Sequence, residues 1–284
     1  MEVRTRVFVL FLFLFMVPGH LFGSEVPQPA ESPLAIAGHA HNDYEHKYPL
    51  WEALSNGFIS IEADIHLVED DFLVAHDIED VTPGRTLSSL YLDPLEELVR
   101  RNRGSVYPDG SSIILMVDVK SSGEEVWPAL RSLLMEYRAM LTFFREGRVR
   151  TGPVTVIVSG NRDWASMSRD DNCPALYDGR IEDLDENPQT ALIPVISAGW
   201  GDLFTWEGEG PVPESDIALM RELIARADSQ GRKVRFWATD VPDPSLQEYA
   251  WDLLLDCGVD LINTDRLDQF RRYVSDKSNE DPDK

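Results

Sequence analysis

Residues suited to metal-assisted acid–base chemistry concentrate between Gly38 and Asp77, a stretch that holds five of the six histidines. Within its apolar run Ile-Glu-Ala-Asp-Ile, Glu62 and Asp64 are two positions apart, so in a strand both side chains point to the same face. Two carboxylates on one face repel each other unless a cation lies between them. Their hard oxygens suit calcium or magnesium better than zinc. The run therefore predicts a divalent-cation site.

Histidines flank these carboxylates on both sides in the sequence. His39 and His41 precede them, and His76 follows a short β-like run downstream. Two imidazoles beside a bound cation would form an acid–base pair, because near neutral pH one can be neutral while the other is protonated. His46 and His66 are interpreted as bystanders, although His66 shares the strand face of the two carboxylates.

Strand-like and helical stretches alternate along the rest of the chain, which predicts parallel βα units. About eight such units indicate a single (β/α)₈ barrel, a fold of roughly 250 residues whose reactive groups lie at the carboxyl ends of the strands. The expected strands are 34–38, 58–65, 112–119, 153–159, 175–177, 192–196, 234–238 and 260–263. Helices are expected between them, among them 124–141 and a closing helix 267–274. The side chains that fall at strand ends are His39, His41, Glu62, Asp64, Asp118, Lys120 and Asn263.

The N-terminus has the pattern of a signal peptide. Arg4 and Arg6 precede an unbroken apolar run, residues 7–17, which is too short to span a bilayer comfortably. Cleavage is expected near Gly23, with an uncleaved anchor as the alternative, so the protein is expected to be secreted or otherwise extracytoplasmic. The expected organisation is a signal peptide 1–23, a mobile linker 24–33, the barrel 34–275 and a disordered acidic tail 276–284.

Charge and cysteine content exclude some classes of protein. The formal net charge is −24, with 26 basic and 50 acidic residues, which argues against a nucleic-acid partner or an anionic membrane surface. A small anionic substrate would need local positive charge, and a bound cation supplies it. Cys173 and Cys257 could pair in an exported protein, but two cysteines do not make a disulfide framework, and two unpaired thiols are an equal alternative.

Motifs along nearly the whole mature chain resemble the superfamily of phosphatidylinositol-specific phospholipases C and glycerophosphodiester phosphodiesterases. The branch named after the "altered inheritance of mitochondria" protein is the most similar. The motifs are HAHNDY (39–44), SIEADIHL (60–67), VAHD (74–77), TLSSLYLDPL (86–95), VDVK (117–120), SGNR (159–162), RFWATD (235–240) and INTD (262–265). The resemblance implies a (β/α)₈ barrel and metal-assisted phosphodiester cleavage, with two histidines as acid and base and three acidic residues around calcium or magnesium.

Carried over residue by residue, the resemblance implies three groups of site residues. The catalytic group is His41 and His76 with His39 in support, the metal group is Glu62, Asp64, Asp118 and Asn42, and the substrate group is Lys120. Arg235 and Trp237 are further candidates for substrate binding, Trp237 because its aromatic ring could line a pocket, with ordinary packing as the alternative. The His-Arg-Gly and Glu-Asn signatures of the glycerophosphodiesterases are absent, so the first catalytic histidine is either His39 or His41 and the released alcohol stays open. The implied substrate is a glycerophosphodiester or a phospholipid-type phosphodiester. A monomer with no membrane span after signal removal is expected.

Other interpretations remain open at this point. His39-Ala40-His41 is also how many metal-dependent amidohydrolases and polymerase-and-histidinol-phosphatase-type phosphoesterases begin, but those sites need histidines from later strands and none follows His76. A catalytically silent barrel that serves as a binding domain is a third possibility. Lys120 could neutralise Asp118 or contact a phosphate, and the aromatic loop 200–206 could line a pocket or pack in the core.

Overall fold

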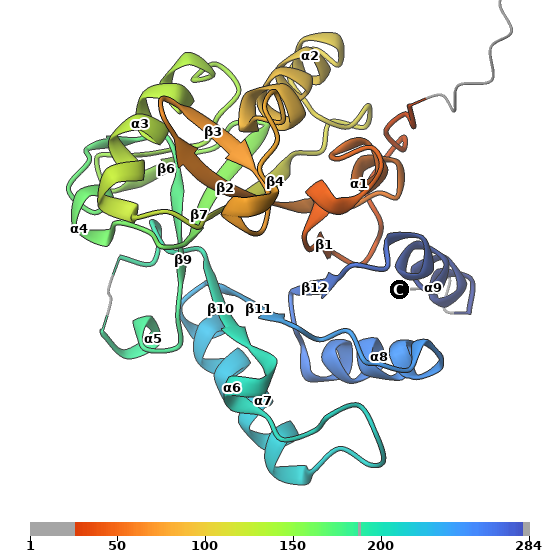
Figure 1. The fold of residues 1–284 in the computed structure, drawn as a ribbon. Coiled ribbons are helices and arrows are strands. Elements are labelled where there is room, and N and C mark those ends of the chain that lie inside the picture. Colours follow the sequence, from red (N-terminus) through yellow and green to blue (C-terminus); the bar gives the residue numbers. More distant parts are fainter. Residues whose placement is uncertain (1–25, 187–188, 281–284) are drawn as a thin grey trace, which may run out of the picture.

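Within residues 26–186 and 189–280, the part of the chain that the computed structural model describes, eight parallel strands close into a barrel (Figure 1). In barrel order they are β1 (Gly38–Ala40), β2 (Ser60–Val68), β4 (Ile113–Val119), β7 (Val154–Gly160), β9 (Leu176–Gly179), β10 (Val195–Gly199), β11 (Lys233–Trp237) and β12 (Leu261–Thr264). Strand β1 closes the ring because it pairs with both β2 and β12. The predicted (β/α)₈ barrel is confirmed.

Helices surround the strands on the outside of the barrel (Figure 1). They are α1 (Trp51–Ser55), α2 (Asp93–Arg101), α3 (Gly123–Glu136), α4 (Trp164–Met167), α5 (Asp183–Glu186), α6 (Trp200–Leu203), α7 (Glu214–Ser229), α8 (Gln247–Cys257) and α9 (Leu267–Glu280). Side chains alternate along each strand, so in β4 Val117 and Val119 face the opposite way from Asp118. Both valines are buried in the hydrophobic core, and Asp118 lines the cavity described below, where Val119 at the end of the strand also reaches the lining.

Two further β-structures lie outside the ring of eight parallel strands. Strand β3 (Asp71–Val74) pairs antiparallel with the far half of β2, and this hairpin brings His76 back over the carboxyl end of the barrel. A small antiparallel sheet is made by β5 (Phe143–Arg145), β6 (Arg148–Arg150) and β8 (Asn172–Cys173). The helix expected over 124–141 stops at Glu136, because the chain then turns to pair Leu141 with Val154 and to enter β5.

Two strands, β1 and β10, begin at least three residues later than the sequence predicted. The first strand is Gly38–Ala40 rather than 34–38, so His39 lies inside the strand and not after it. The segment before it crosses towards α1, where the Leu34 N–H donates to the Gly57 carbonyl. Strand β10 starts at Val195 rather than at residue 192, because Pro194 has no N–H to donate to a sheet ladder.

The boundaries of the predicted linker and tail also need correction. Along the described part of 24–33, the Ala30 N–H donates to the Leu54 carbonyl and the Glu31 carbonyl accepts from Asp109, so this end of the segment is attached to the barrel. Helix α9 continues to Glu280, beyond the predicted start of the tail at 276. Residues 281–284 and the predicted signal peptide 1–23 lie outside the described residues, and export stays a prediction.

In the described ranges, every helix is too short or too polar to cross a lipid bilayer. Cys173 and Cys257 are both buried and are not joined in a disulfide.

Candidate active site

A cavity of about 550 Å³ opens at the carboxyl ends of the barrel strands. Its lining residues are His41, Asn42, Glu62, His76, Asp118, Val119, Lys120, Ser159, Gly160, Asn161, Arg180, Arg235, Trp237 and Ala238. All of the predicted site residues except His39 and Asp64 are in this lining. The structure therefore brings most of these residues together at one cavity, and the two exceptions contact its lining, His39 through Glu62 and Asp64 through His76. Their roles stay predictions.

Three carboxylates from two neighbouring strands gather on one side of the cavity. Oxygen atoms of Glu62, Asp64 and Asp118 lie within 4.8 Å of one another, and Asp64 and Asp118 are register partners in the β2–β4 ladder. The Oδ1 atoms of Asp64 and Asp118 are buried and have no hydrogen-bond partner among the described residues. Gly160, at φ +67°, leaves room for one of them, because a Cβ there would lie 1.9 Å from Asp118 Oδ1. Two buried oxygens with unused lone pairs are what a cation ligand requires.

The charges of this cluster oppose one another. Burial and the negative charge of Glu62 raise the pKa values of both Asp64 and Asp118 above the usual range. A cation bound between the carboxylates would favour their ionised forms and reverse that shift. The arrangement therefore fits a divalent cation.

Glu62 is held from behind by a buried histidine and a buried arginine. His39 Nδ1 lies 2.7 Å from Ser60 Oγ and His39 Nε2 lies 2.7 Å from Glu62 Oε2. Arg235 Nη1 donates to the same Glu62 oxygen at 2.8 Å and also contacts His39 Nε2. Burial alone would raise the pKa of Glu62, but Arg235 and His39 hold it well below its usual value. Burial and the charge of Arg235 lower the pKa of His39 to about 4, so His39 is a neutral residue that positions Glu62.

The two histidines in the cavity wall are each oriented by a carboxylate. His41 Nδ1 lies 2.7 Å from Asp265 Oδ1, and His76 Nδ1 lies 3.0 Å from Asp64 Oδ2. Burial would lower the pKa of His41, but the hydrogen bond to Asp265 and the negative charge of Glu62 raise it above the usual value. In both rings the Nδ1 atom is engaged, which leaves Nε2 for proton exchange.

Tyr44 and Lys120 complete the polar contacts of the cluster. The Tyr44 hydroxyl lies 2.7 Å from Asp64 Oδ2 and 2.9 Å from Asn42 Oδ1, so it links the first motif to strand β2. Lys120 Nζ lies 3.0 Å from Asp64 Oδ2 and 3.3 Å from Asp118 Oδ2. Lys120 therefore forms ion pairs with both aspartates and also lines the cavity. Its contact with a phosphate stays a prediction.

The remaining residues considered from the sequence are spread around the site. Trp237 is 39% exposed and forms part of the cavity wall. Asn263 is buried beside His39 in the β1–β12 ladder. His46 lies 3.7 Å from Glu52, and His66 Nε2 donates to the backbone oxygen of His76 at 3.1 Å. Neither His46 nor His66 lines the cavity.

Strand β9, two strands round the barrel from β4, carries a polar group that the sequence did not point to. Asp178 is fully buried, and its carboxylate accepts hydrogen bonds from Ser159 at 2.7 Å and from Ser197 at 2.6 Å. Arg180 Nη1 donates to the same carboxylate at 2.6 Å. The available signal was Asp-Gly-Arg directly after the weak fifth strand, where the carboxyl-end rule for barrels places reactive groups.

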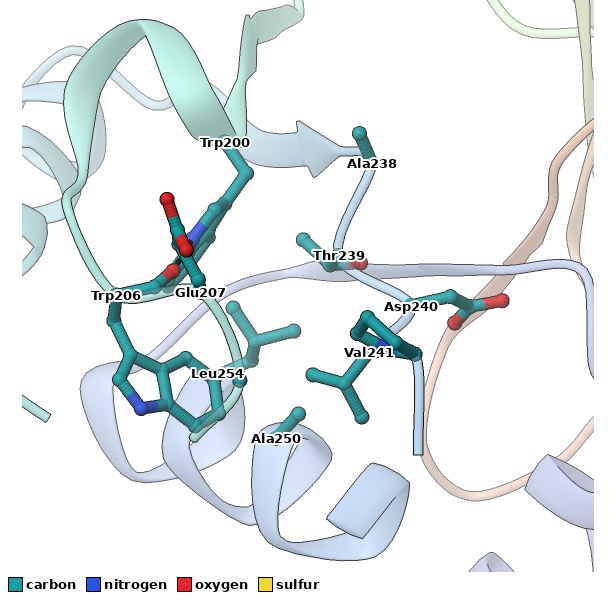
Figure 2. Close-up of a pocket in the computed structure, with 11 residues that line it drawn as sticks. Trp200, Trp206, Glu207, Ala238, Thr239, Asp240, Val241, Ala250 and Leu254 are labelled. Atoms are coloured by element: carbon teal, nitrogen blue, oxygen red, sulfur yellow. Dashed lines mark hydrogen bonds between the residues drawn. The ribbon is translucent and has the colours of Figure 1, made fainter. Parts of the chain in front are cut away.

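The aromatic loop 200–206 lines a second, smaller cavity of about 110 Å³. Figure 2 shows Trp200 and Trp206 on one side of this space, with Val241, Ala250 and Leu254 on the other. Trp200 also packs edge-on against Phe236 in β11, with ring centroids 6.4 Å apart. The loop therefore packs against the barrel beside the main cavity. The lining of the smaller cavity and the lining of the main cavity have one residue in common, Ala238.

Asp43, two positions after His41, gives a pH-dependent test of this part of the structure. Its buried carboxylate accepts from the Leu50 N–H at 2.6 Å and from the Tyr91 hydroxyl at 2.9 Å, and burial raises its pKa from 3.8 to about 7. The folded protein thus binds this proton more tightly than the unfolded chain, so the associated stability is present below pH 3.8 and is lost as pH rises to about 7. Asp43→Asn keeps an acceptor and removes the charge. Its melting temperature relative to the parent protein is expected to rise between about pH 4 and about pH 8. A difference that does not change with pH would contradict the assignment.

A metal-compatible acidic cluster between two histidines, at the carboxyl end of a closed (β/α)₈ barrel, defines a barrel of the phosphodiesterase type. The solved structure of a glycerophosphoryl diester phosphodiesterase from Parabacteroides distasonis has the same fold, with a TM-score of 0.50, 17% sequence identity and coverage of 89% of this chain and 90% of that one.

Sequence comparison identifies the family. Residues 31–177 match the AIM6-like phosphodiesterase domain. The altered inheritance of mitochondria protein 6 homolog of Arthroderma benhamiae is 31% identical over 84% of this chain and 83% of its own length. Altered inheritance of mitochondria protein 6 of Eremothecium gossypii is 25% identical over 85% of this chain and 70% of its own. The chain belongs to the AIM6-like phosphodiesterase domain family, as its motifs indicated.

Proposed function

We propose that the protein is a metal-dependent phosphoric diester hydrolase that uses two histidines as general acid and base. The observation that carries the proposal is the pair of unpartnered, buried oxygens, Asp64 Oδ1 and Asp118 Oδ1, in a carboxylate cluster that spans 4.8 Å. The substrate class that fits is a glycerophosphodiester or a phospholipid head-group phosphodiester, small enough to enter a cavity of about 550 Å³.

The cation would be held by Glu62, Asp64 and Asp118, with Asn42 in the cavity wall beside them. Bound there, a calcium or magnesium ion supplies positive charge for the non-bridging phosphoryl oxygens. Hard oxygen ligands favour these ions over zinc.

Side chains of the protein would carry out proton transfer and add positive charge. His41 and His76 both line the cavity, so one can take the proton of the attacking hydroxyl or water while the other gives a proton to the departing alkoxide. The raised pKa of His41 favours its protonated form, which suits the acid. The Lys120 ammonium, fixed by Asp64 and Asp118, adds positive charge beside the phosphoryl group.

The geometry does not favour an amidohydrolase-type site built on His39-Ala40-His41. Both ring nitrogens of His39 are already engaged, Nδ1 with Ser60 and Nε2 with Glu62, so His39 has no lone pair directed at a metal in the cavity. A binding-only barrel would keep the cavity without turnover, and this is one outcome of the experiment below.

A screen of phosphodiesters with calcium, with magnesium and with a chelator tests the proposal. The parent protein is expected to hydrolyse at least one glycerophosphodiester or phospholipid in the presence of one ion and to lose that activity in chelator. A protein with both His41→Ala and His76→Ala serves as the inactive control. If folded, metal-loaded parent protein hydrolyses none of these substrates, the phosphodiesterase proposal is refuted. The catalytically silent binding domain is then the interpretation that stands.

A further inference from the structure

One wall of the cavity, next to Ser159 on β7, is built around one arginine. The Arg180 side chain is 32% exposed and lines the cavity, while its partner Asp178 is fully buried behind it. The Asp178 carboxylate is fixed by hydroxyl groups from two further strands, Ser159 on β7 and Ser197 on β10. A buried carboxylate with three donors holds the guanidinium in a fixed position and cannot itself reach a ligand.

Arg180 has N–H groups that its hydrogen bonds within the protein do not use. Its hydrogen bonds to Asp178, to the Gly179 carbonyl and to Ser159 all come from Nη1 and Nη2. Among the described residues these bonds use at most three of the five N–H groups of a guanidinium. The others are available to a ligand in the cavity.

A second cation lies next to Arg180. Arg162 stacks on the Tyr177 ring at 4.7 Å and donates to the Gly160 carbonyl at 2.9 Å, and its Nε is buried with no hydrogen-bond partner in the described residues. Burial and the nearby charge of Arg180 lower the pKa of Arg162. Arg162 does not line the cavity, so its charge favours an anion at Arg180 only through space, in a protein whose net charge is −24.

The arginine is displaced from the proposed metal cluster by a distance that one small substrate can span. Asp118 is the register partner of Ser159, and Val158 is the register partner of Tyr177, so Asp178 lies two strands away from Asp118. Two strand spacings are roughly 10 Å. The Arg180 guanidinium reaches back from there towards the cluster, with Nη2 3.5 Å from Ser159 Oγ on the intervening strand, so it lies between one and two strand spacings from Asp118. A group on the alcohol part of a phosphodiester bound at the cluster is within reach of it.

We infer that Arg180 recognises a second anionic group, a carboxylate or a phosphate monoester, on the alcohol part of the phosphodiester substrate. A planar guanidinium binds either group through two parallel hydrogen bonds, which gives a preference over a neutral alcohol. The inference rests on the proposed phosphodiesterase function and specifies the substrate class of that site.

Two matched substrate pairs separate the possible anions. Glycerophosphoserine differs from glycerophosphoethanolamine by one carboxylate, and glycerophosphoinositol 4-phosphate differs from glycerophosphoinositol by one phosphate. The parent protein is expected to prefer the anionic member of one pair by ~10-fold or more in kcat/KM, mainly through KM, the scale of a hydrogen bond to a charged group. Arg180→Gln should reduce that ratio to about 1 and Arg180→Lys should restore part of it. Arg226→Gln, which removes an arginine paired with Asp185 outside the cavity, should leave the ratio as it is.

Removal of Arg180 alone leaves the Asp178 charge buried, which could prevent folding. The double variant Asp178→Asn with Arg180→Gln removes both charges and should also abolish the preference. Calorimetric binding of the same pairs, with magnesium or calcium present, separates the two proposals. Arg180-dependent preference in binding without hydrolysis would refute the enzyme and support this inference. Hydrolysis or binding with no preference in either pair, or no binding of any member, would overturn it.

Discussion

Replacing His41 or His76 with alanine is expected to lower turnover of the best phosphodiester substrate by at least ~10²-fold, the lower range for loss of a general acid or base. Both imidazoles line the cavity, and each has Nδ1 engaged by a carboxylate, Asp265 or Asp64, which leaves Nε2 for the reaction. Steady-state kinetics at saturating cation would measure the effect. Near-normal turnover in either variant would remove that histidine from the mechanism.

His39 provides the contrasting case. Because it is fully buried behind Glu62, His39→Ala should act through Glu62 and lower cation affinity, so part of the lost activity should return at higher cation concentration. A His39 variant that stays inactive at any cation concentration, combined with an active His41 variant, would show that the first motif had been aligned two residues out of register.

The pH profile should identify the acid. If His41 donates the proton, activity is lost as pH rises through its raised pKa. Asp265→Asn weakens the interaction that raises this pKa, so the alkaline limb of the profile should move to lower pH, by an amount limited by the solvent exposure of Asp265. An alkaline limb that does not move would assign the acid to another group.

The acidic half of the site could be read from the sequence because strand geometry is local. Alternation alone places Glu62 and Asp64 on one face, and an apolar neighbourhood buries them. The carboxyl-end rule for barrels then brings Asp118 to the same place from the next barrel strand, and the structure pairs it in register with Asp64. These two rules needed no knowledge of side-chain contacts.

The supporting contacts could not be read in this way because they join residues that are distant in sequence. His39 was expected after its strand, and only the true start of β1 at Gly38 shows that its ring is buried against Glu62. The Asp178–Arg180 pair was hidden by a fifth strand with a weak hydrophobic pattern. The bond from Tyr44 to Asp64 depends on a loop conformation in which Asn42 has a φ of +47°.

The cation site should be visible in protein stability even without a substrate. A cation that binds only the folded state stabilises it by about 2.7 kcal/mol at a concentration of 100 times its Kd, which for a domain of this size raises the melting temperature by roughly 5–10 °C. Calcium or magnesium should therefore raise the melting temperature of the parent protein, and a chelator should remove the increase. Glu62→Gln should abolish it, although this change also disturbs His39 and Arg235.

Asp118→Asn is the more specific test, because its expected effect on the melting temperature differs between the metal-free protein and the protein with cation. Burial and the charge of Glu62 raise the pKa of Asp118, so its ionised form is unfavourable in the metal-free protein. Removal of that charge should keep or increase the melting temperature in chelator and should abolish the increase caused by the cation. Asp265→Asn, a carboxylate change next to His41 but outside the three-carboxylate cluster, should retain the cation effect. Identical melting of the parent protein in calcium, magnesium and chelator would refute the cation site. A lower melting temperature of Asp118→Asn in chelator would mean that the charge of Asp118 stabilises the metal-free fold through its ion pair with Lys120.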